Sequence, residues 1–444
     1  MFQRVLVANR GEIALRIMRA CRELGIATVV AHSQADSDSL PVQLADDAVC
    51  VGPGSAGRSY LNIPSMISAA LIKDCEAVHP GYGFLAENRY FAEVCQRYNL
   101  TFIGPTPEVI AQMANKVEAR GAMAAAGLPV LPGTAEPLGG LDGALEAAKE
   151  IGYPVMIKAA GGGGGRGMHL AQDSDDLVQN FVTAQRESRA AFGNDELYLE
   201  KYLPQCRHVE VQVIADGGRA IHLGDRDCSI QRRHQKIVEE APSPLLPEAT
   251  RRKLGADAVR GAEAVSFNSA GTLEFLVDDD GRHYFLEMNT RIQVEHGISE
   301  MITGADIVKS QILIAAGEAG ELRQEEIHFS GHALECRVNA ESGPDFRPAT
   351  GRVSDLRLPG GPGIRVDTHL FSGYNLPAHY DSLVAKIMAW GRDRGEAIAR
   401  MRGALEETVV EGIATTIPYL RKVMGDPAFI SGGVHTDYVE LLDR

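Results

Sequence analysis

A run of five glycines restricts what this chain can fold into more than any other feature. Residues 161–165 are all glycine, and they follow almost directly after the apolar stretch 155–158, which is typical of a buried β-strand. Without Cβ atoms, the amides of such a run can turn inward and surround an anion. No Lys-Ser or Lys-Thr pair follows the glycines, so the run is not a Walker A loop. A flexible linker is the alternative, but we favour a mobile hairpin that covers phosphates.

The first third of the chain alternates short apolar runs with helical repeats. Apolar runs at 5–8, 27–32, 77–78 and 101–104 are typical of strands, and a helical repeat between the first two ends at Gly25. Strand and helix in this rhythm predict a parallel α/β sheet. The glycine spacing G-x-G-x-x-G is missing after the first strand, so binding of NAD there is not favoured.

Later segments predict an antiparallel sheet. A stretch rich in proline and glycine, 127–143, marks a boundary in the chain. Beyond about residue 204, strands are expected at 208–215, 220–224, 272–277 and 282–288. The fold class that we expect is therefore mixed, α/β in the N-terminal part and α+β in the rest.

Composition excludes several classes of protein. The 444 residues are 45% hydrophobic and 23% charged, as in a globular chain of two or three domains. The 59 acidic and 44 basic residues give a net charge of −15, which argues against nucleic acid or anionic lipid as partner. We find no uncharged apolar window of membrane-spanning length and no secretory leader. The seven cysteines are dispersed, which predicts reduced thiols and a cytoplasmic protein.

Two glutamates in a predicted hairpin are candidate metal ligands. If residues 278–281 form the loop, Glu274 faces Phe285 and lies diagonal to Glu287 on the same face. Asn289 adds a neutral oxygen on that face. An all-oxygen set of this kind suits Mg²⁺ or Mn²⁺ better than zinc, although a solvated acidic face has the same pattern.

The segment that follows places a polar residue at every odd position. From Glu287 to Glu295 the polar side chains alternate with apolar residues or threonine. If the chain stays extended, one face presents a carboxylate, an amide, a guanidinium, an amide and a carboxylate. Arg291 could then hold a planar oxyanion through two hydrogen bonds, and Glu295 could accept a proton from it.

Together these segments resemble the biotin carboxylase family of the ATP-grasp superfamily. The resemblance runs from residue 8 to about 340 and is specific because it needs many motifs in one order. The motifs are ANRGEIALRI, HPGYGFLAEN, KAAGGGGGRGM, EKYL, RHVEVQ, RDCSIQRRHQKIVEEAP, EMNTRIQVEH and ECRVNAE.

The resemblance implies a reaction and an architecture. Members of the family use ATP to activate bicarbonate as carboxyphosphate and then carboxylate biotin on a carrier protein, the first half-reaction of acetyl-CoA or another acyl-CoA carboxylase. The implied cofactors are ATP and Mg²⁺ or Mn²⁺, with carrier-bound biotin as a substrate. The implied domains are a Rossmann-like domain at 1–115, a linker and lid at 116–203, and a C-terminal region at 204–444.

The resemblance also implies roles for particular residues. The implied ATP-binding residues are Lys116, Lys158, Gly163, Gly164, Gly165, Gly167, Glu200, Lys201, Leu203, His208, Gln231 and His234. The implied bicarbonate and biotin residues are Lys236, Arg291, Gln293, Val294, Tyr82 and Arg337. Among these, Lys236, Arg291 and Arg337 count as catalytic together with Glu295, which matches the base that deprotonates bicarbonate. Glu274, Glu287 and Asn289 match the positions associated with the metal ion.

The implied partners are a biotin carboxyl carrier protein, a carboxyltransferase and a second copy of the chain. Arg19, Glu23 and Arg365 match dimer contacts, whereas Pro362 stands where phenylalanine is frequent, which weakens the expectation of a dimer. Gly297 replaces a usual proline, and the loop 342–351 also departs from the family pattern. No M-K-M biotin-attachment motif is present, so we expect a free-standing subunit, with a piece of a longer carboxylase as the alternative.

Two other functions share parts of this pattern. Another ATP-grasp ligase, joining an amine to an acyl phosphate, would have the glycine loop and the carboxylates but no need for Arg291, Glu295 and Arg337 together. A non-catalytic nucleotide-binding subunit would bind ATP without turnover, yet every matched catalytic position holds a chemically competent side chain.

Overall fold

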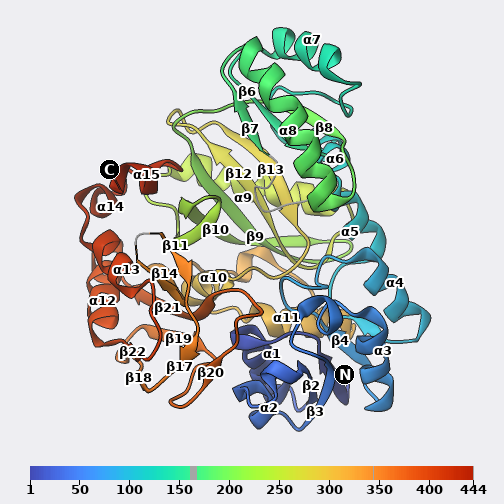
Figure 1. Ribbon diagram of the computed structural model, residues 1–444, viewed down its shortest axis with the longest axis vertical. Helices are drawn as coiled ribbons and strands as arrows, with labels where there is room; N and C mark the ends of the chain where they lie inside the picture. The colour runs from blue at the N-terminus through green and yellow to red at the C-terminus, as the bar shows by residue number, and fades with distance from the viewer. Residues whose placement is uncertain (161–167, 344, 444) are drawn as a thin grey trace.

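The computed structural model of the chain describes residues 1–160, 168–343 and 345–443 (Figure 1). The predicted phosphate-covering residues Gly163, Gly164, Gly165 and Gly167 lie outside these described residues. Among the residues described, no helix is both long and apolar enough to cross a membrane.

A five-stranded parallel sheet forms the N-terminal part, with the order β3-β2-β1-β4-β5. Its strands are β1 (Arg4–Val7), β2 (Ala27–Ser33), β3 (Asp47–Gly52), β4 (Ala77–His79) and β5 (Thr101–Phe102). The accompanying helices are α1 (Gly11–Glu23), α2 (Leu40–Leu44), α3 (Ile63–Ile72), α4 (Arg89–Arg97), α5 (Pro107–Ala114) and α6 (Lys116–Ala125). The prediction of a parallel α/β sheet is confirmed, because buried apolar strands are paired in parallel and covered by helices.

A small layered unit stands apart at the top of Figure 1. It contains an antiparallel sheet of order β7-β6-β8 against two helices. The elements are β6 (Val155–Ala159), β7 (His169–Ala171), β8 (Leu197–Lys201), α7 (Leu141–Ile151) and α8 (Ser174–Phe192). Val155 and Ile157 on β6 pack with Leu177 and Phe181 of α8, so this unit has a hydrophobic core of its own.

An eight-stranded antiparallel sheet forms the centre, with the order β13-β12-β9-β10-β11-β14-β21-β19 (Figure 1). Its strands are β9 (Arg207–Asp216), β10 (Ala220–Arg232), β11 (Gln235–Ala241), β12 (Asn268–Val277), β13 (His283–Asn289), β14 (His332–Asn339), β19 (Ile364–Thr368) and β21 (Leu383–Gly391). The helices are α9 (Glu248–Ala264), α10 (His296–Thr303), α11 (Ile307–Ala315), α12 (Arg394–Glu407), α13 (Ile417–Gly425), α14 (Pro427–Ser431) and α15 (Tyr438–Leu442). The expected antiparallel C-terminal part is thereby confirmed.

Alternation along β9 explains how this sheet can hold both a core and a polar site. Val209, Val211 and Val213 pack in the core beneath α9. The residues between them, His208, Glu210 and Gln212, therefore point to the opposite face, where they are buried but polar. One face of the sheet is apolar for stability, and the other supplies functional groups.

The sequence-based register of the hairpin β12–β13 is wrong. Glu274 does not face Phe285: the structure pairs Glu274 with Glu287 and Phe275 with Phe285, and the register shifts between Glu274 and Phe275. The predicted loop 278–281 is one residue too short, because Val277 pairs with His283. A further residue, inserted in β13 as in a β-bulge, brings the two carboxylates directly opposite each other rather than on a diagonal.

The segment 287–295 also differs from the extended chain that the alternation predicts. β13 ends at Asn289, and the chain bends through Thr290 and Arg291 before α10 begins at His296. The chain leaves the edge of the sheet here, so no neighbouring strand holds residues 290–295 extended. Turn geometry, and not strand alternation, places the polar side chains of this segment.

Candidate active site

A cavity of about 1290 Å³ lies between the N-terminal sheet, the small unit and the polar face of the large sheet. Most of the residues predicted for the site line it. They are Tyr82, Lys116, Lys158, Lys201, Leu203, His208, Gln231, His234, Lys236, Glu274, Glu287, Asn289, Arg291, Gln293, Val294, Glu295 and Arg337. Glu200 does not line the cavity, because its carboxylate is buried and turned to Lys158 and Arg120.

The carboxyl ends of β1 and β4 supply one wall of the cavity. Asn9, just after β1, donates from Nδ2 to the carbonyls of Pro80 (2.6 Å) and Tyr82 (2.8 Å). These two bonds fix the turn after β4, where Gly81 and Gly83 have φ of +64° and +68°. The turn presents Tyr82, whose hydroxyl donates to Glu12 on α1 (2.5 Å). The carboxyl ends of parallel strands are the usual place for ligands in such sheets.

Three carboxylates lie side by side across the large sheet. Glu287 on β13 pairs in register with Glu274 on β12, which pairs in register with Glu210 on β9. Arg226 on β10 pairs with Glu210 and ends the row. Like charges directly opposite one another repel, so this row needs cations between its members.

Lys236 on β11 supplies one of those cations. Its Nζ donates to Glu210 (2.6 Å), Glu274 (3.0 Å) and Glu295 (2.7 Å). Burial alone would lower the pKa of Lys236, but these three carboxylates outweigh burial and raise the pKa well above its ordinary value. The ammonium therefore stays charged at neutral pH. The pKa of the neighbouring Cys228 thiol is also raised well above its ordinary value, by burial first, so this thiol stays protonated.

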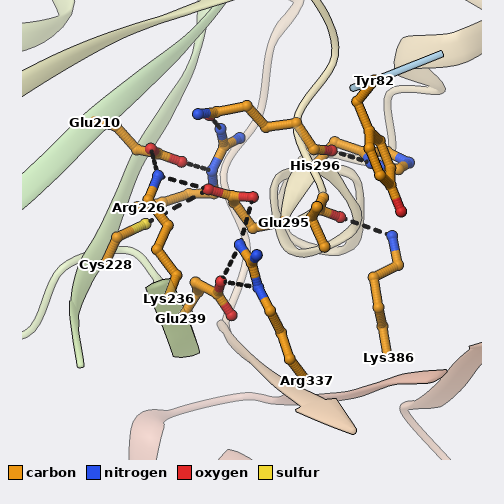
Figure 2. Close-up of polar contacts among 12 residues, drawn as sticks. Tyr82, Glu210, Arg226, Cys228, Lys236, Glu239, Glu295, His296, Arg337 and Lys386 are labelled. Carbon is orange, nitrogen blue, oxygen red and sulfur yellow. Dashed lines mark hydrogen bonds and ion pairs between the residues drawn. The ribbon is translucent and has the colours of Figure 1, made fainter. Parts of the chain in front are cut away.

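Glu295 lies at the centre of the site, at the start of α10 (Figure 2). Its Oε1 accepts from Lys236 (2.7 Å), and its Oε2 accepts from Arg337 (2.9 Å). Burial alone would raise the pKa of Glu295, but Lys236, Arg337 and Arg226 outweigh it and hold the pKa below its ordinary value. The carboxylate is thus ionised and able to accept a proton.

The turn that carries Glu295 is fixed through its backbone. Lys386 on β21 is fully buried and donates from Nζ to the carbonyl of Val294 (2.7 Å). The ring Nδ1 of His296 lies 2.7 Å from the carbonyl of Gln293. Contacts on both sides of Glu295 therefore leave its carboxylate little freedom to turn away from the cavity (Figure 2).

Arg337 on β14 connects Glu295 to a second buried carboxylate. Its Nε donates to Oε1 of Glu239 (2.6 Å), and its Nη2 donates to Glu295 (2.9 Å). Burial raises the pKa of Glu239 to about 7, with Arg337 opposing that rise and Glu295 adding to it. The planar fork of a guanidinium can span two acceptors in this way, which an ammonium cannot.

Two lysines face the cavity from the side of the small unit. Lys116 at the start of α6 donates to Glu287 (2.8 Å), and the carboxylate raises its pKa against the effect of burial. Lys158 on β6 donates to Glu200. Both lysines lie beside the start of the glycine segment, since Lys158 is two residues before Ala160 and the backbone N–H of Lys116 donates to the carbonyl of Ala160 (3.1 Å).

Oxygen atoms that could hold a divalent cation lie beside Lys116. Glu274 and Glu287 are opposite each other, and Asn289 follows on the same strand, with Nδ2 bonded to Glu274 (2.9 Å) and Oδ1 accepting from Arg291 (3.3 Å). Carboxylate and amide oxygens suit Mg²⁺. Ligand atoms of His208, Glu210 and Glu274 also lie within 4.8 Å of one another, but Lys236 bonds to both of those glutamates.

Arg291 has a partner that its sequence context did not indicate. Its Nε donates to Glu87 (2.8 Å), whose other oxygen accepts from the backbone N–H of Thr290 (3.1 Å). Glu87, in the N-terminal part, therefore orients the Arg291 guanidinium toward the cavity. An extended strand does not.

Sequence reasoning missed several charged groups that hold the site together. Glu210, Arg226, Glu239 and Glu87 make direct contacts with predicted site residues, yet none was predicted. The alternation of valine with His208, Glu210 and Gln212 was a usable signal, because a strand buried on both faces has no reason for three polar residues unless they contact partners.

Three family models match the chain. "Biotin carboxylase, N-terminal domain" matches residues 1–110, and "Carbamoyl-phosphate synthase L chain, ATP binding domain" matches residues 115–323. "Biotin carboxylase C-terminal domain" matches residues 335–441. Together they span nearly the whole sequence.

Individual proteins are similar over their full length. A biotin carboxylase of Nostoc sp. is 52% identical over 445 residues, covering 100% of both chains. The biotin carboxylase of Campylobacter jejuni in a β,γ-ATP complex has a TM-score of 0.97 and 45% identity, covering 99% of each chain. The biotin carboxylase domain dimer of Hydrogenobacter thermophilus 2-oxoglutarate carboxylase, with MgADP, ADP and bicarbonate, has a TM-score of 0.96 and 47% identity. It covers 100% of this chain and 99% of its own.

Proposed function

This chain belongs to the biotin carboxylase family, and from that premise we propose how its cavity uses ATP and bicarbonate to carboxylate biotin. The protein is an ATP-dependent ligase with the ATP-grasp fold. The observation that carries the proposal is the position of Glu295, an ionised carboxylate between Lys236 and Arg337 at the bottom of the cavity. We divide the chain into a Rossmann-like domain at 1–115, a linker and lid at 116–203 and a C-terminal region at 204–444.

The nucleotide binds on the side of the small unit. Lys116 and Lys158 pair with phosphate oxygens in place of Glu287 and Glu200, and the glycines of 161–167 cover them. Lys201, Leu203, His208, Gln231 and His234 complete the nucleotide site, and Glu200 acts behind the cavity lining through its contact with Lys158. Glu274, Glu287 and Asn289 would hold Mg²⁺ or Mn²⁺, which would neutralise phosphate charge when bound.

Bicarbonate binds among Lys236, Arg291, Gln293 and the Val294 backbone. Glu295 takes the proton from the bicarbonate hydroxyl, and the resulting oxyanion attacks the γ-phosphorus of ATP, which gives carboxyphosphate and ADP. Lys236 and Arg291 stabilise the negative charge on the reacting oxygens. The low pKa of Glu295 rises as bicarbonate competes for its two cations, which makes the carboxylate a stronger base when it is needed.

Biotin binds at the end of the cavity that Arg337 and Tyr82 share. The carbon–oxygen bond of carboxyphosphate breaks to give CO₂ and phosphate, and the phosphate takes the N1 proton of biotin. The negative charge that this places on the ureido oxygen is stabilised by the guanidinium of Arg337 while N1 attacks the carbon of CO₂. The Tyr82 ring packs against the ureido group. Arg337 is already anchored by Glu239, so little reorganisation is needed at the moment of reaction.

The partners and location follow from this chemistry. The biotin is presented by a biotin carboxyl carrier protein, and a carboxyltransferase passes the carboxyl group on to an acyl-CoA or another acceptor. A homodimer forms through the exposed side of α1, where Arg19 and Glu23 lie, and through Arg365. The seven cysteines are free thiols, which supports the cytoplasm as the location.

Biotin-stimulated cleavage of ATP tests the proposed function. With MgATP and bicarbonate present, free biotin is expected to raise the rate of phosphate release and to yield carboxybiotin that contains labelled bicarbonate carbon. The rate is measured with and without bicarbonate and with and without biotin. If biotin does not raise the rate of phosphate release at saturating bicarbonate, the carboxylase function is contradicted and another ATP-grasp reaction is favoured.

The pH dependence of the reaction is expected to include the titration of Glu239. Burial raises the pKa of Glu239 to about 7, so the residue is protonated below that pH and ionised above it. Only the ionised form of Glu239 forms an ion pair with Arg337. The biotin-dependent rate should therefore fall as the pH drops through about 7. In Glu239→Gln, which does not titrate, this fall should be absent and the rate at high pH lower. Rates are compared at constant bicarbonate-ion concentration; an identical fall in Glu239→Gln would assign it to another group.

A further inference from the structure

Arg226 on β10 is fully buried beneath the cavity, and none of its surface is exposed. A guanidinium has five N–H donors, and each one has an acceptor here. Nε donates to Glu210 (2.6 Å), Nη1 to Gln212 (2.7 Å) and Ser299 (2.9 Å), and Nη2 to Thr272 (3.1 Å) and Gln293 (2.9 Å). The acceptors come from β9, β12, the turn after β13 and α10.

A buried ion of this kind contributes little to the stability of the fold. Removing a guanidinium from water costs several kcal/mol, and well-packed apolar residues can often replace such an ion pair without loss. Orientation of other side chains therefore explains the contacts of Arg226 better than stability does. Two of its five acceptors, Glu210 and Gln293, are themselves in contact with site residues.

The guanidinium determines which way the amide of Gln293 points. Oε1 of Gln293 accepts from Arg226, so its NH₂ group is left to donate to Glu274 (2.9 Å) and to face the cavity. With the opposite orientation, two donors would face each other. The Gln293 donor group therefore depends on the arginine below it.

The same guanidinium holds Glu210 in place for Lys236. Oε1 of Glu210 accepts from Arg226, and Oε2 accepts from Lys236 (2.6 Å). Arg226 thus lies behind two of the groups that face the bicarbonate position, without lining the cavity itself. Figure 2 shows Arg226, Glu210 and Lys236 on one side of Glu295.

We propose that Arg226 is a positioning residue for the bicarbonate site, acting through Gln293 and through the pair of Glu210 with Lys236. This inference rests on the proposed function, because it needs Gln293 and Lys236 to bind bicarbonate. Lysine at this position has three donors on one nitrogen and cannot reach acceptors spread over four segments.

Arg226→Lys tests this role. The variant should lower kcat/KM for bicarbonate by about 10- to 100-fold, the usual effect of losing hydrogen bonds to a charged group, while the Kd for MgATP changes by less than about threefold. Gln293→Ala and the double variant are measured as well. If Arg226 acts through Gln293, the two changes together should cost much less than the product of their separate effects.

Ser299→Ala and Thr272→Val are the matched controls. Each removes one hydroxyl that Arg226 contacts without touching Gln293 or Glu210, so bicarbonate saturation should stay within about threefold of wild type. If Arg226→Lys does not fold, the double variant Arg226→Gln with Glu210→Gln replaces it, because it removes two opposite buried charges together. The expected loss in kcat/KM for bicarbonate is the same.

The outcomes separate this inference from the proposed function. Wild-type protein without biotin-stimulated ATP cleavage would overturn the proposed function. Active wild type with unchanged bicarbonate saturation in the folded Arg226 variant would overturn the positioning role alone. Equal losses in the hydroxyl controls, or equal losses toward ATP and bicarbonate, would also overturn it, because they would indicate general loosening of the core.

Discussion

Glu295→Gln is expected to lower bicarbonate-dependent ATP cleavage by about 10²- to 10⁴-fold, the range that a positioned general base supplies. The amide has the same shape as the carboxylate but cannot accept the proton of bicarbonate. Lys236 keeps Glu210 and Glu274 as partners and Arg337 keeps Glu239, so the cations stay in place. The loss should therefore appear in kcat, measured by phosphate release at saturating bicarbonate.

Binding of ATP separates a lost base from a damaged site. The Kd for MgATP, measured by calorimetry, should change by less than about threefold, because Glu295 is at the bicarbonate end of the cavity. Glu93→Gln is the matched control: this glutamate on α4 pairs with Arg89, outside the cavity lining, and its loss should leave the rate unchanged. A Glu295→Gln variant with more than about half of the wild-type rate would exclude Glu295 as the base.

The fold was predictable wherever local patterns decide the structure. The strands β1, β2, β6 and β9 were expected from short apolar or alternating runs, and the structure has each within a few residues. The register of β12 with β13 was predicted wrongly for two reasons: the loop is one residue longer than expected, with Val277 paired to His283, and a second shift lies between Glu274 and Phe275. The bend after Asn289 was missed for a similar reason: alternation does not reveal where a sheet ends.

The candidate site was predictable in its chemistry but not in its pairing. Lys116, Lys158, Lys236, Arg291 and Arg337 were expected to bind ATP, bicarbonate or biotin, and all five line the cavity. What the sequence could not indicate is that each cation already has a carboxylate partner, such as Glu87 for Arg291 and Glu239 for Arg337. These partners are about 100 to 200 residues away in the chain.

Arg226 and Glu210 illustrate why buried charges escape prediction from sequence. An arginine in a strand is usually exposed, and its local context is the same whether it reaches solvent or five internal acceptors. Only the pairing of β10 with β9 places it next to Glu210 and beneath Gln293. The polar residues between the valines of β9 were the one local sign that this face of the sheet was not core.

Arg337→Lys is expected to remove the stimulation of ATP cleavage by biotin and to leave the slower, biotin-independent cleavage largely intact. Arg337 donates through Nε to Glu239 and through Nη2 to Glu295, so one planar group is anchored by Glu239 while its Glu295 side can exchange that contact for an oxyanion. The ammonium of lysine cannot span both positions. Loss of one such stabilising donor should lower the rate of carboxybiotin formation by about 10²- to 10³-fold.

The contrast between the two rates makes this prediction specific. Glu295 keeps Lys236 in the Arg337→Lys variant, so deprotonation of bicarbonate and attack on ATP can still occur, and only the transfer to biotin loses its stabilising group. Arg252→Lys is the control, because Arg252 lies on α9 with most of its side chain exposed and pairs there with Glu248. Both rates are measured in the same preparation, with labelled bicarbonate for the transfer step. If biotin still stimulated the variant as it does the wild type, Arg337 would have no role in biotin carboxylation, and an equal loss of both rates would place it in the bicarbonate step instead.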